Sequence, residues 1–246
     1  MKIIAGNWKM NGVPSENRQR LQDIKSLVKA SEDKVIVFPP YTSLGDAQAI
    51  LADSPIAWGA QNVYPASEGA YTGEISVTML ANLGATYCLV GHSERRQYFK
   101  ESGEFLSRKI EALMAANITP VFCIGETLEQ YEAGLVTGVL ERQLREALAT
   151  RPEINKNNFI ISYEPVWAIG TGKTATPDDA NRTMGMIRET LALLDYPTDI
   201  YLLYGGSAKP KNAKALLSEE NIDGLLIGGA SLEPQSFNEM INWSEL

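Results

Sequence analysis

The amino-acid sequence predicts an α/β fold, namely a closed (β/α)8 barrel of eight parallel strands formed by one domain over residues 1–246. Short apolar runs recur about eight times at intervals of roughly 20–40 residues, which is the size of a βα unit. The runs are almost continuously hydrophobic, as is typical of strands buried on both faces of a parallel sheet. Segments with the apolar spacing of helices separate them, and such alternation defines an α/β protein.

The runs expected to form strands are 3–8, 35–38, 57–61, 87–90, 120–124, 159–163, 200–204 and 224–227. A doubly wound open sheet is the alternative arrangement of such units. It usually has fewer strands and one glycine-rich phosphate loop near its start, whereas the glycine pairs of this chain come late, at 205–206 and 228–229. A chain of this length without a compositional break favours the closed barrel.

The segments between the runs carry helical spacing. Apolar residues recur every three or four positions in three of them: Leu21, Ile24 and Val28; Leu140, Leu144 and Leu148; and Met184, Ile187, Leu191 and Leu194. The last of these helices has a clear start signal, because Thr176 can act as the N-cap, Pro177 suits the first turn and two acidic residues follow.

The composition argues against several classes of function. The chain has 22 basic and 30 acidic residues and a net charge of −8, so a surface that tracks nucleic-acid phosphates is not expected. His92 is the only histidine, and Cys88 and Cys123 are the only cysteines. A metal cluster is therefore not expected, and because both cysteines lie in apolar runs, they are expected to be buried free thiols.

The hydropathy of the chain gives expectations about its location. No stretch approaches the ~20 apolar residues of a membrane span, and the first apolar run is too short for a signal sequence. Two cysteines in a chain this long do not suggest a disulfide scaffold. We expect a cytoplasmic protein that does not act at a membrane.

Candidate catalytic residues follow three of the runs. In (β/α)8 barrels the chemistry takes place in the loops at the carboxyl ends of the strands. Lys9 follows the first run, His92 the fourth and Glu164 the sixth. A purely structural role is the alternative for each of them. Lys9 would then be a solvated surface lysine, His92 a hydrogen-bonded structural histidine and Glu164 a salt-bridged loop acid. Glu164 is a candidate general base. His92 precedes a possible helical turn, whose partial positive charge favours a neutral imidazole.

The segment after Glu164 combines stiff ends with a small, glycine-rich middle. It consists of Pro165, Val166, Trp167, Ala168, Ile169, Gly170, Thr171, Gly172, Lys173, Thr174 and Ala175. This pattern favours a lid that closes over a substrate, and an ordinary long loop is the alternative.

Glycine pairs follow the seventh and eighth runs, in Gly205-Gly206-Ser207 and Gly228-Gly229. Backbone N–H groups at such turns can approach an anion closely, and barrels often bind a phosphate at these two loops. Tight turns are the alternative. A base, a neutral histidine, a lysine and a phosphate site suit proton abstraction next to a carbonyl, with stabilisation of an enediolate. No metal or redox cofactor is indicated.

These residues closely resemble the triosephosphate isomerase family, whose fold is the TIM barrel. The motifs that carry the resemblance run in order through the whole chain: AGNWKMNG, GAQNVYP, GAYTGE, GHSERR, VFCIGET, YEPVWAIGTGKTA, YGGS and GGASL. The segment YEPVWAIGTG is highly specific. The resemblance implies interconversion of dihydroxyacetone phosphate and D-glyceraldehyde 3-phosphate without a cofactor.

The resemblance also implies roles for individual residues. Glu164 would move a proton between two carbons, and His92 would polarise the carbonyl oxygens. A neutral histidine at a helix N-terminus and a closing loop are known features of that family. Lys9 would stabilise negative charge, Asn7 would donate a hydrogen bond nearby, and Glu94 would support the proton relay and tie down Lys9.

The phosphate and a second subunit would be bound by other parts of the chain. By the resemblance, Gly170, Ser207, Gly228 and Gly229 would bind the phosphate. In this family the loop over residues 61–74 reaches into a neighbouring subunit, with Thr72 as the contacting residue. We therefore expect a homodimer; a mobile solvent loop is the alternative.

Three positions depart from the common family pattern. Tyr71 stands where Phe is frequent, Ala208 follows YGGS where Val is frequent, and Gly103 stands where Asp is commoner. None of these touches the expected chemistry. Gly103 is expected to weaken the start of a helix by up to ~1 kcal/mol.

Two other functions are compatible with a barrel. An epimerase or ketol isomerase for a longer phosphosugar would share the glycine pairs, but GHSERR and YEPVWAIGTG argue against it. A non-catalytic barrel would be expected to have lost Lys9, His92 or Glu164, and all three are present.

Overall fold

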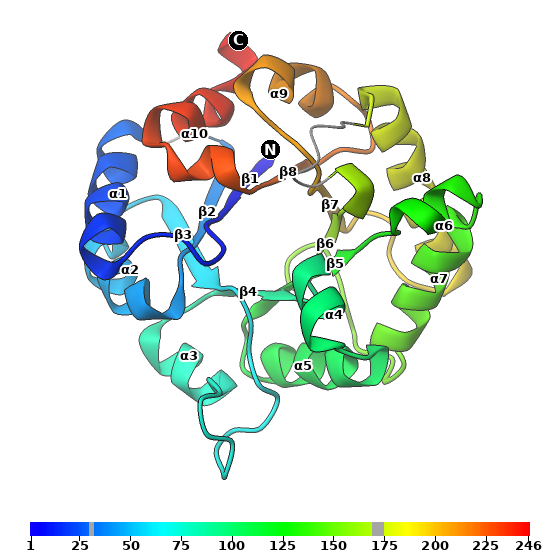
Figure 1. Cartoon of the computed structure of the whole chain (residues 1–246), viewed down its shortest axis with the longest axis horizontal. Coiled ribbons are helices and arrows are strands. Elements are labelled where there is room, and N and C mark those ends of the chain that lie inside the picture. Colours follow the sequence, from blue (N-terminus) through cyan, green and yellow to red (C-terminus); the bar gives the residue numbers. More distant parts are fainter. Residues whose placement is uncertain (30–31, 169–174) are drawn as a thin grey trace.

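The eight apolar runs form the eight parallel strands of a closed barrel in the computed structural model, which describes residues 1–29, 32–168 and 175–246 (Figure 1). The strands are β1 (Ile3–Asn7), β2 (Lys34–Phe38), β3 (Ile56–Ala60), β4 (Tyr87–Val90), β5 (Thr119–Ile124), β6 (Ile160–Tyr163), β7 (Tyr201–Tyr204) and β8 (Gly224–Ile227). Neighbours in sequence pair in parallel, and β1 also pairs with β8, which closes the barrel. The predicted fold class is confirmed.

Helices surround the barrel as a ring (Figure 1). They are α1 (Pro14–Leu27), α2 (Leu44–Leu51), α3 (Val77–Leu83), α4 (Ser93–Phe99), α5 (Gly103–Ala115), α6 (Leu128–Glu132), α7 (Val136–Ala147), α8 (Pro177–Leu193), α9 (Pro210–Leu217) and α10 (Pro234–Ile241). Short 3-10 turns lie at Tyr41–Ser43, Val166–Ala168, Gly229–Leu232 and Trp243–Glu245. No helix in the described ranges is both long enough and apolar enough to cross a membrane.

The three predicted apolar stripes lie on α1, α7 and α8 and face inward. Their buried members include Leu21 and Ile24 on α1, Leu140 and Leu144 on α7, and Met184, Ile187 and Leu191 on α8. The predicted start of α8 is also present, because the Thr176 hydroxyl accepts a hydrogen bond from the Asp179 amide at 3.1 Å. Each fully buried leucine or isoleucine contributes about 1.5–3 kcal/mol, so these stripes hold the helices against the strands.

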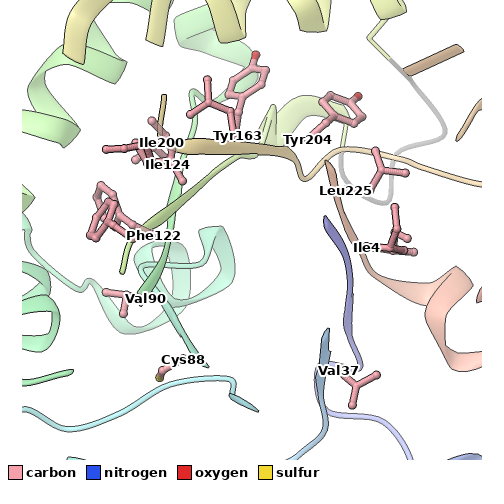
Figure 2. Packing of buried hydrophobic residues seen from close by; sticks show 14 of the residues in the cluster. Ile4, Val37, Cys88, Val90, Phe122, Ile124, Tyr163, Ile200, Tyr204 and Leu225 are labelled. Carbon is pink, nitrogen blue, oxygen red and sulfur yellow. The ribbon is translucent and has the colours of Figure 1, made fainter. Parts of the chain in front are cut away.

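Alternate residues of the strands form two separate cores, because side chains of a strand point to opposite faces in turn. One cluster contains Ala5, Phe38, Val121 and Cys123 and fills the barrel. The other faces the helices, and Figure 2 shows members of it such as Phe122. Cys88 belongs to the second core and Cys123 to the first, and both are free and fully buried, as predicted. Burial raises the pKa of both thiols, which keeps them protonated.

The segment between β3 and α3 protrudes from the ring of helices (Figure 1). At its base the Tyr64 amide donates to the Ile75 carbonyl at 2.8 Å. The rings of Tyr64 and Tyr71 stack with centroids 4.3 Å apart, so the Tyr71 found in place of the frequent Phe keeps an aromatic contact inside this loop. Thr72 is exposed on it.

Gly103 is the first residue of α5 and follows the N-cap Ser102, whose hydroxyl accepts from the Phe105 amide at 3.3 Å. A Cβ atom at position 103 would lie 2.3 Å from the Cβ of Glu146 on α7. Glycine at this position therefore has a packing reason, because a side chain would push α5 and α7 apart. Glycine at position 103 is expected to weaken the start of α5, and it also allows α5 and α7 to pack closely.

Candidate active site

Most of the predicted site residues meet in one cavity at the carboxyl end of the barrel. Its volume is about 380 Å³. Its lining includes Asn7, Lys9, His92, Glu164, Ser207, Gly228 and Gly229. They come from the carboxyl ends of five different strands or from the loops that follow them, and the closed barrel brings them together because all its strands end on the same side. Gly170 lies outside the described residues. Thr72 belongs to the segment between β3 and α3, which protrudes from the ring of helices (Figure 1), and it does not line this cavity.

Glu164 follows β6 directly and is 1 % exposed. Its Oε2 accepts a hydrogen bond from the Ser93 amide at 2.9 Å, and its Oε1 lies 3.3 Å from Nε2 of His92. The Ser93 amide belongs to the first turn of α4, where unpaired N–H groups and the helix dipole favour a carboxylate. The carboxyl group is thus held between the helix start and the imidazole.

Two glycines make room for Glu164. Gly205 is predicted from the sequence only as part of a candidate phosphate loop, and Gly125 is not singled out there. A Cβ atom on Gly125 would lie 1.8 Å from the Glu164 carbonyl oxygen. A Cβ atom on Gly205 would lie 2.8 Å from the Glu164 Cγ. Their positions directly after strands were the only signal. Gly125 allows the chain after β5 to lie against the backbone of Glu164 after β6, whereas Gly205 lies against the Glu164 side chain.

His92 is the N-cap residue of α4. Its Nδ1 accepts a hydrogen bond from the Glu94 amide at 3.3 Å. A Glu94 carboxylate oxygen lies farther from the same nitrogen, at 3.5 Å. A proton on Nδ1 would face the amide hydrogen, so we assign Nδ1 as the acceptor and Nε2 as the protonated nitrogen of a neutral imidazole. That Nε2–H group is directed toward Glu164 and can donate to a ligand oxygen.

Lys9 adopts a left-handed backbone conformation with φ 51°, which is uncommon for a residue with a side chain and concentrates at functional sites. The Asn7 side-chain oxygen accepts from the Lys9 amide at 3.0 Å, and the Gln61 side-chain amide donates to the Lys9 carbonyl at 2.8 Å. The Lys9 ammonium is 2.7 Å from Glu94 Oε1. Asn7, Gln61 and Glu94 therefore fix the position of this positive charge.

The described part of the expected lid begins as a 3-10 turn over Val166–Ala168. The Glu126 carboxylate anchors it by accepting from Trp167 Nε1 at 2.7 Å and from the Tyr163 hydroxyl at 3.0 Å. The ring of Tyr131 on α6 lies against Trp167 with centroids 4.5 Å apart. Burial raises the pKa of Glu126. Pro165 and Ala175 are buried at the two ends of the segment, and residues 169–174 lie outside the described ranges.

A larger cavity of about 880 Å³ adjoins the site on the side of β1 to β4. Asn7, Lys9, His92 and Glu94 contribute to its wall. Its rim carries apolar side chains that face solvent, namely Met10 at 96 % exposure, Tyr98 at 68 % and Phe99 at 65 %. Exposed apolar patches of this kind mark interaction surfaces.

Fold and site together define a (β/α)8-barrel protein with a polar site at the carboxyl ends of its strands. The family model of triosephosphate isomerase matches residues 2–244 of the chain. The chain belongs to the triosephosphate isomerase family, and the prediction of an isomerase is thereby confirmed.

Relatives and solved structures agree with this assignment. The triosephosphate isomerase of Fusobacterium nucleatum is 47% identical over 243 residues, which cover 97% of either chain. That of Caldanaerobacter subterraneus is 44% identical, with 98% of either chain covered. The crystal structure of triosephosphate isomerase from Bartonella henselae superposes with a TM-score of 0.90 at 37% identity, covering 100% of this chain and 99% of the other.

Proposed function

We propose that this protein interconverts dihydroxyacetone phosphate and D-glyceraldehyde 3-phosphate by proton transfer through an enediolate, and that it needs no cofactor. Membership of the triosephosphate isomerase family supports the overall reaction. The single observation that carries the mechanism is the convergence of Lys9, His92 and Glu164 on one cavity beside two glycine-rich turns. One barrel domain over residues 1–246 supplies all of these groups.

In this mechanism Glu164 is the general base. Its carboxylate takes a proton from the carbon next to the substrate carbonyl and returns it to the neighbouring carbon. To do so, the carboxylate must leave the Ser93 amide, which it contacts at 2.9 Å, and move toward the substrate. Its position at the wall of the cavity, at the end of β6, makes this a short displacement.

His92 and Lys9 stabilise the negative charge that proton removal creates. The Nε2–H of His92 donates to the carbonyl oxygen and moves protons between the two oxygens of the enediolate. The Lys9 ammonium attracts the developing charge, and Asn7 donates a hydrogen bond beside it. Glu94 keeps Lys9 in position through the 2.7 Å ion pair and holds His92 through its amide, which supports the proton relay.

The phosphate occupies the glycine-rich side of the cavity. Ser207, Gly228 and Gly229 line it, and the 3-10 turn Gly229–Leu232 starts there with N–H groups that can donate to an anion. Gly170 completes the phosphate contacts when residues 165–175 close as a lid. Closure excludes water and protects the enediolate from losing its phosphate.

We also propose a homodimer in which the loop with Thr72 docks into the partner's 880 Å³ cavity. Two observations support it: the loop protrudes from the ring (Figure 1), and the cavity is rimmed by the exposed Met10, Tyr98 and Phe99. Burying these three side chains would stabilise the complex. The proposed setting is the cytoplasm, without nucleic acid or membrane as a partner.

An isomerase assay combined with sedimentation analysis tests this function. Coupled assays should show turnover of triose phosphates and none of pentose phosphates, and the active species should sediment as a dimer. Turnover of pentose phosphates would favour another phosphosugar isomerase. Failure to exchange solvent deuterium into dihydroxyacetone phosphate would indicate a non-catalytic barrel.

A further inference from the structure

A second cavity lies behind Glu164, on the side away from the proposed substrate. Its volume is about 440 Å³. Its wall comes from α4, from the loop after β5, from α6 and α7, and from the segment after β6: Gly91, Ser93, Arg96, Gln97, Lys100, Cys123, Ile124, Gly125, Thr127, Gln130, Gln143, Glu164 and Val166. We refer to it as the rear cavity.

Among the residues that the structure describes, the rear cavity and the substrate cavity share one, Glu164. Its two carboxylate oxygens contact different walls. Oε1 lies 3.3 Å from Nε2 of His92, which lines the substrate cavity, and Oε2 is bound at 2.9 Å to the amide of Ser93, which lines the rear cavity. The two oxygens of this buried carboxyl group therefore contact one residue from the wall of each cavity.

The rear cavity is suited to hold water. Its wall carries several polar side chains, including Arg96, Thr127 and Gln143. Arg96 donates to the carbonyls of Gly91 and Cys123. Gln143 binds the backbone of Gly125. A cavity of this size has room for several waters, since each takes about 30 Å³, and its polar groups can serve as the two to four partners that a water needs. Gln97, Lys100 and Thr127 are exposed as well as lining the cavity, so it opens to solvent between α4 and α6.

We propose that the rear cavity is the route by which the hydrogen that Glu164 takes from substrate exchanges with solvent. The inference rests on the proposed role of Glu164 as the base. It adds a path for exchange that does not pass through the substrate cavity.

The exchange step swaps one hydrogen ion (H+ or D+) of the carboxyl group for one from water. After abstraction, one oxygen of the neutral carboxyl group carries the hydrogen from substrate. The carboxyl group then moves back toward the Ser93 amide, its resting contact, and rotation about the Cγ–Cδ bond, a torsion with a broad and roughly twofold profile, places that oxygen on the Ser93 side. There the carboxyl group gives its hydrogen to a water in the rear cavity and takes one back, so charge and composition are unchanged. Rotation back presents a solvent hydrogen to the enediolate.

A chemical label that can be attached at the solvent opening of the rear cavity and later removed tests this route. In the variant Gln97→Cys the new thiol is exposed, whereas Cys88 and Cys123 are fully buried, so an aryl methanethiosulfonate added to the folded protein should label position 97. Because Cys123 also lines the rear cavity, the parent protein is treated in the same way, and mass spectrometry should find no label on it. D-glyceraldehyde 3-phosphate is then converted in D2O, and NMR gives the ratio of product that keeps the substrate hydrogen to product that carries deuterium. We expect labelling to raise this ratio about tenfold, which corresponds to ~1.4 kcal/mol on the competing exchange barrier.

The same sample supplies its own control, because a thiol reductant removes the label and should restore the unlabelled ratio. The matched variant Glu111→Cys places the label on an exposed position of α5 outside the cavity and should leave the ratio unchanged. An unchanged ratio in labelled Gln97→Cys would overturn the proposal. So would loss of turnover on labelling, because the rear cavity is argued to be separate from the substrate. Absence of isomerisation by the unmodified protein would instead refute the proposed function.

Discussion

The two ends of the barrel use charged residues in opposite ways. At the amino end, Asp223 accepts from Arg188 at 2.7 Å and from the Leu202 amide at 2.8 Å, while Asp33 accepts from the Lys2 amide at 2.6 Å and from Trp243 Nε1 at 2.9 Å. These contacts join segments that are far apart in sequence.

At the carboxyl end, the side chains of Lys9, His92 and Glu164 line a cavity, and Lys9 holds an uncommon backbone conformation. Charged residues at the amino end therefore connect distant segments of the fold, whereas those at the carboxyl end line the proposed substrate site, as is typical of (β/α)8 barrels. The comparison predicts that mutations at the two ends affect different measurements.

The largest expected effect is on catalysis, in Glu164→Asp. The shorter side chain withdraws the base by about one methylene, and a misplacement of ~1 Å can reduce turnover about hundredfold. We expect kcat to fall by at least that factor with KM little changed, because the lost interaction belongs to the transition state. Steady-state kinetics measures kcat and KM, and thermal unfolding checks that the variant is folded and as stable as the parent. An unchanged kcat would remove Glu164 from the role of base.

The opposite pattern is expected at the amino end, in Asp223→Ala. Loss of a carboxylate that binds Arg188 and the Leu202 amide should lower the free energy of unfolding by about 1.5–3 kcal/mol, the range for hydrogen bonds to charged groups. The kcat of the folded enzyme should not change. The exposed pair Lys156–Asp199, with atoms 3.6 Å apart, gives the control. Asp199→Ala should cost less than ~1 kcal/mol, and a large fall in kcat for Asp223→Ala would contradict the comparison.

The sequence predicts the residues at the carboxyl end well, for a physical reason. Strands buried on both faces read as apolar runs, so the strand ends were placed to within a residue. Once eight parallel strands close, every residue that follows a strand lies on the same side. Lys9, His92 and Glu164 therefore meet even though they are far apart in sequence.

Contacts that depend on distances between elements could not be predicted. Nothing local in the sequence shows that Gly125 and Gly205 border Glu164, or that Gly103 lies against Glu146. These contacts follow from strand register and helix packing. The same holds for the hydrogen bond from Trp243 to Asp33, which joins residues 210 positions apart.

A smaller effect on catalysis is expected from Gly205→Ala. The added methyl group would lie 2.8 Å from the Glu164 Cγ and would push the side chain from its place. We expect kcat to fall by about tenfold with a small change in stability. Gly138 on α7 is the matched control, because a Cβ atom there meets nothing within 4 Å. Gly138→Ala should leave kcat unchanged and stabilise the helix by about 0.5–1 kcal/mol. Equal kcat values for the two variants would show that Gly205 does not position the base.

The smallest expected effect concerns Glu126, a buried carboxylate at the carboxyl end. Burial raises its pKa in the folded protein, so the folded state binds this proton more tightly than the unfolded chain. Stability from this group is therefore present below the unfolded pKa of ~4.3 and is lost as pH rises through the raised value. Glutamine cannot ionise, yet its oxygen can still accept from Tyr163 and Trp167.

We thus expect Glu126→Gln to be more stable than the parent at neutral pH, with a difference that shrinks as the pH falls toward ~4.3. Urea unfolding across this range measures it. The neighbouring Glu129 is exposed on α6, and Glu129→Gln is the matched control for loss of one carboxylate. If the difference in the free energy of unfolding between Glu126→Gln and the parent does not vary with pH, ionisation of Glu126 does not destabilise the folded protein. The difference between the two ends of the barrel would then concern only the residues that line the substrate cavity, and not Glu126.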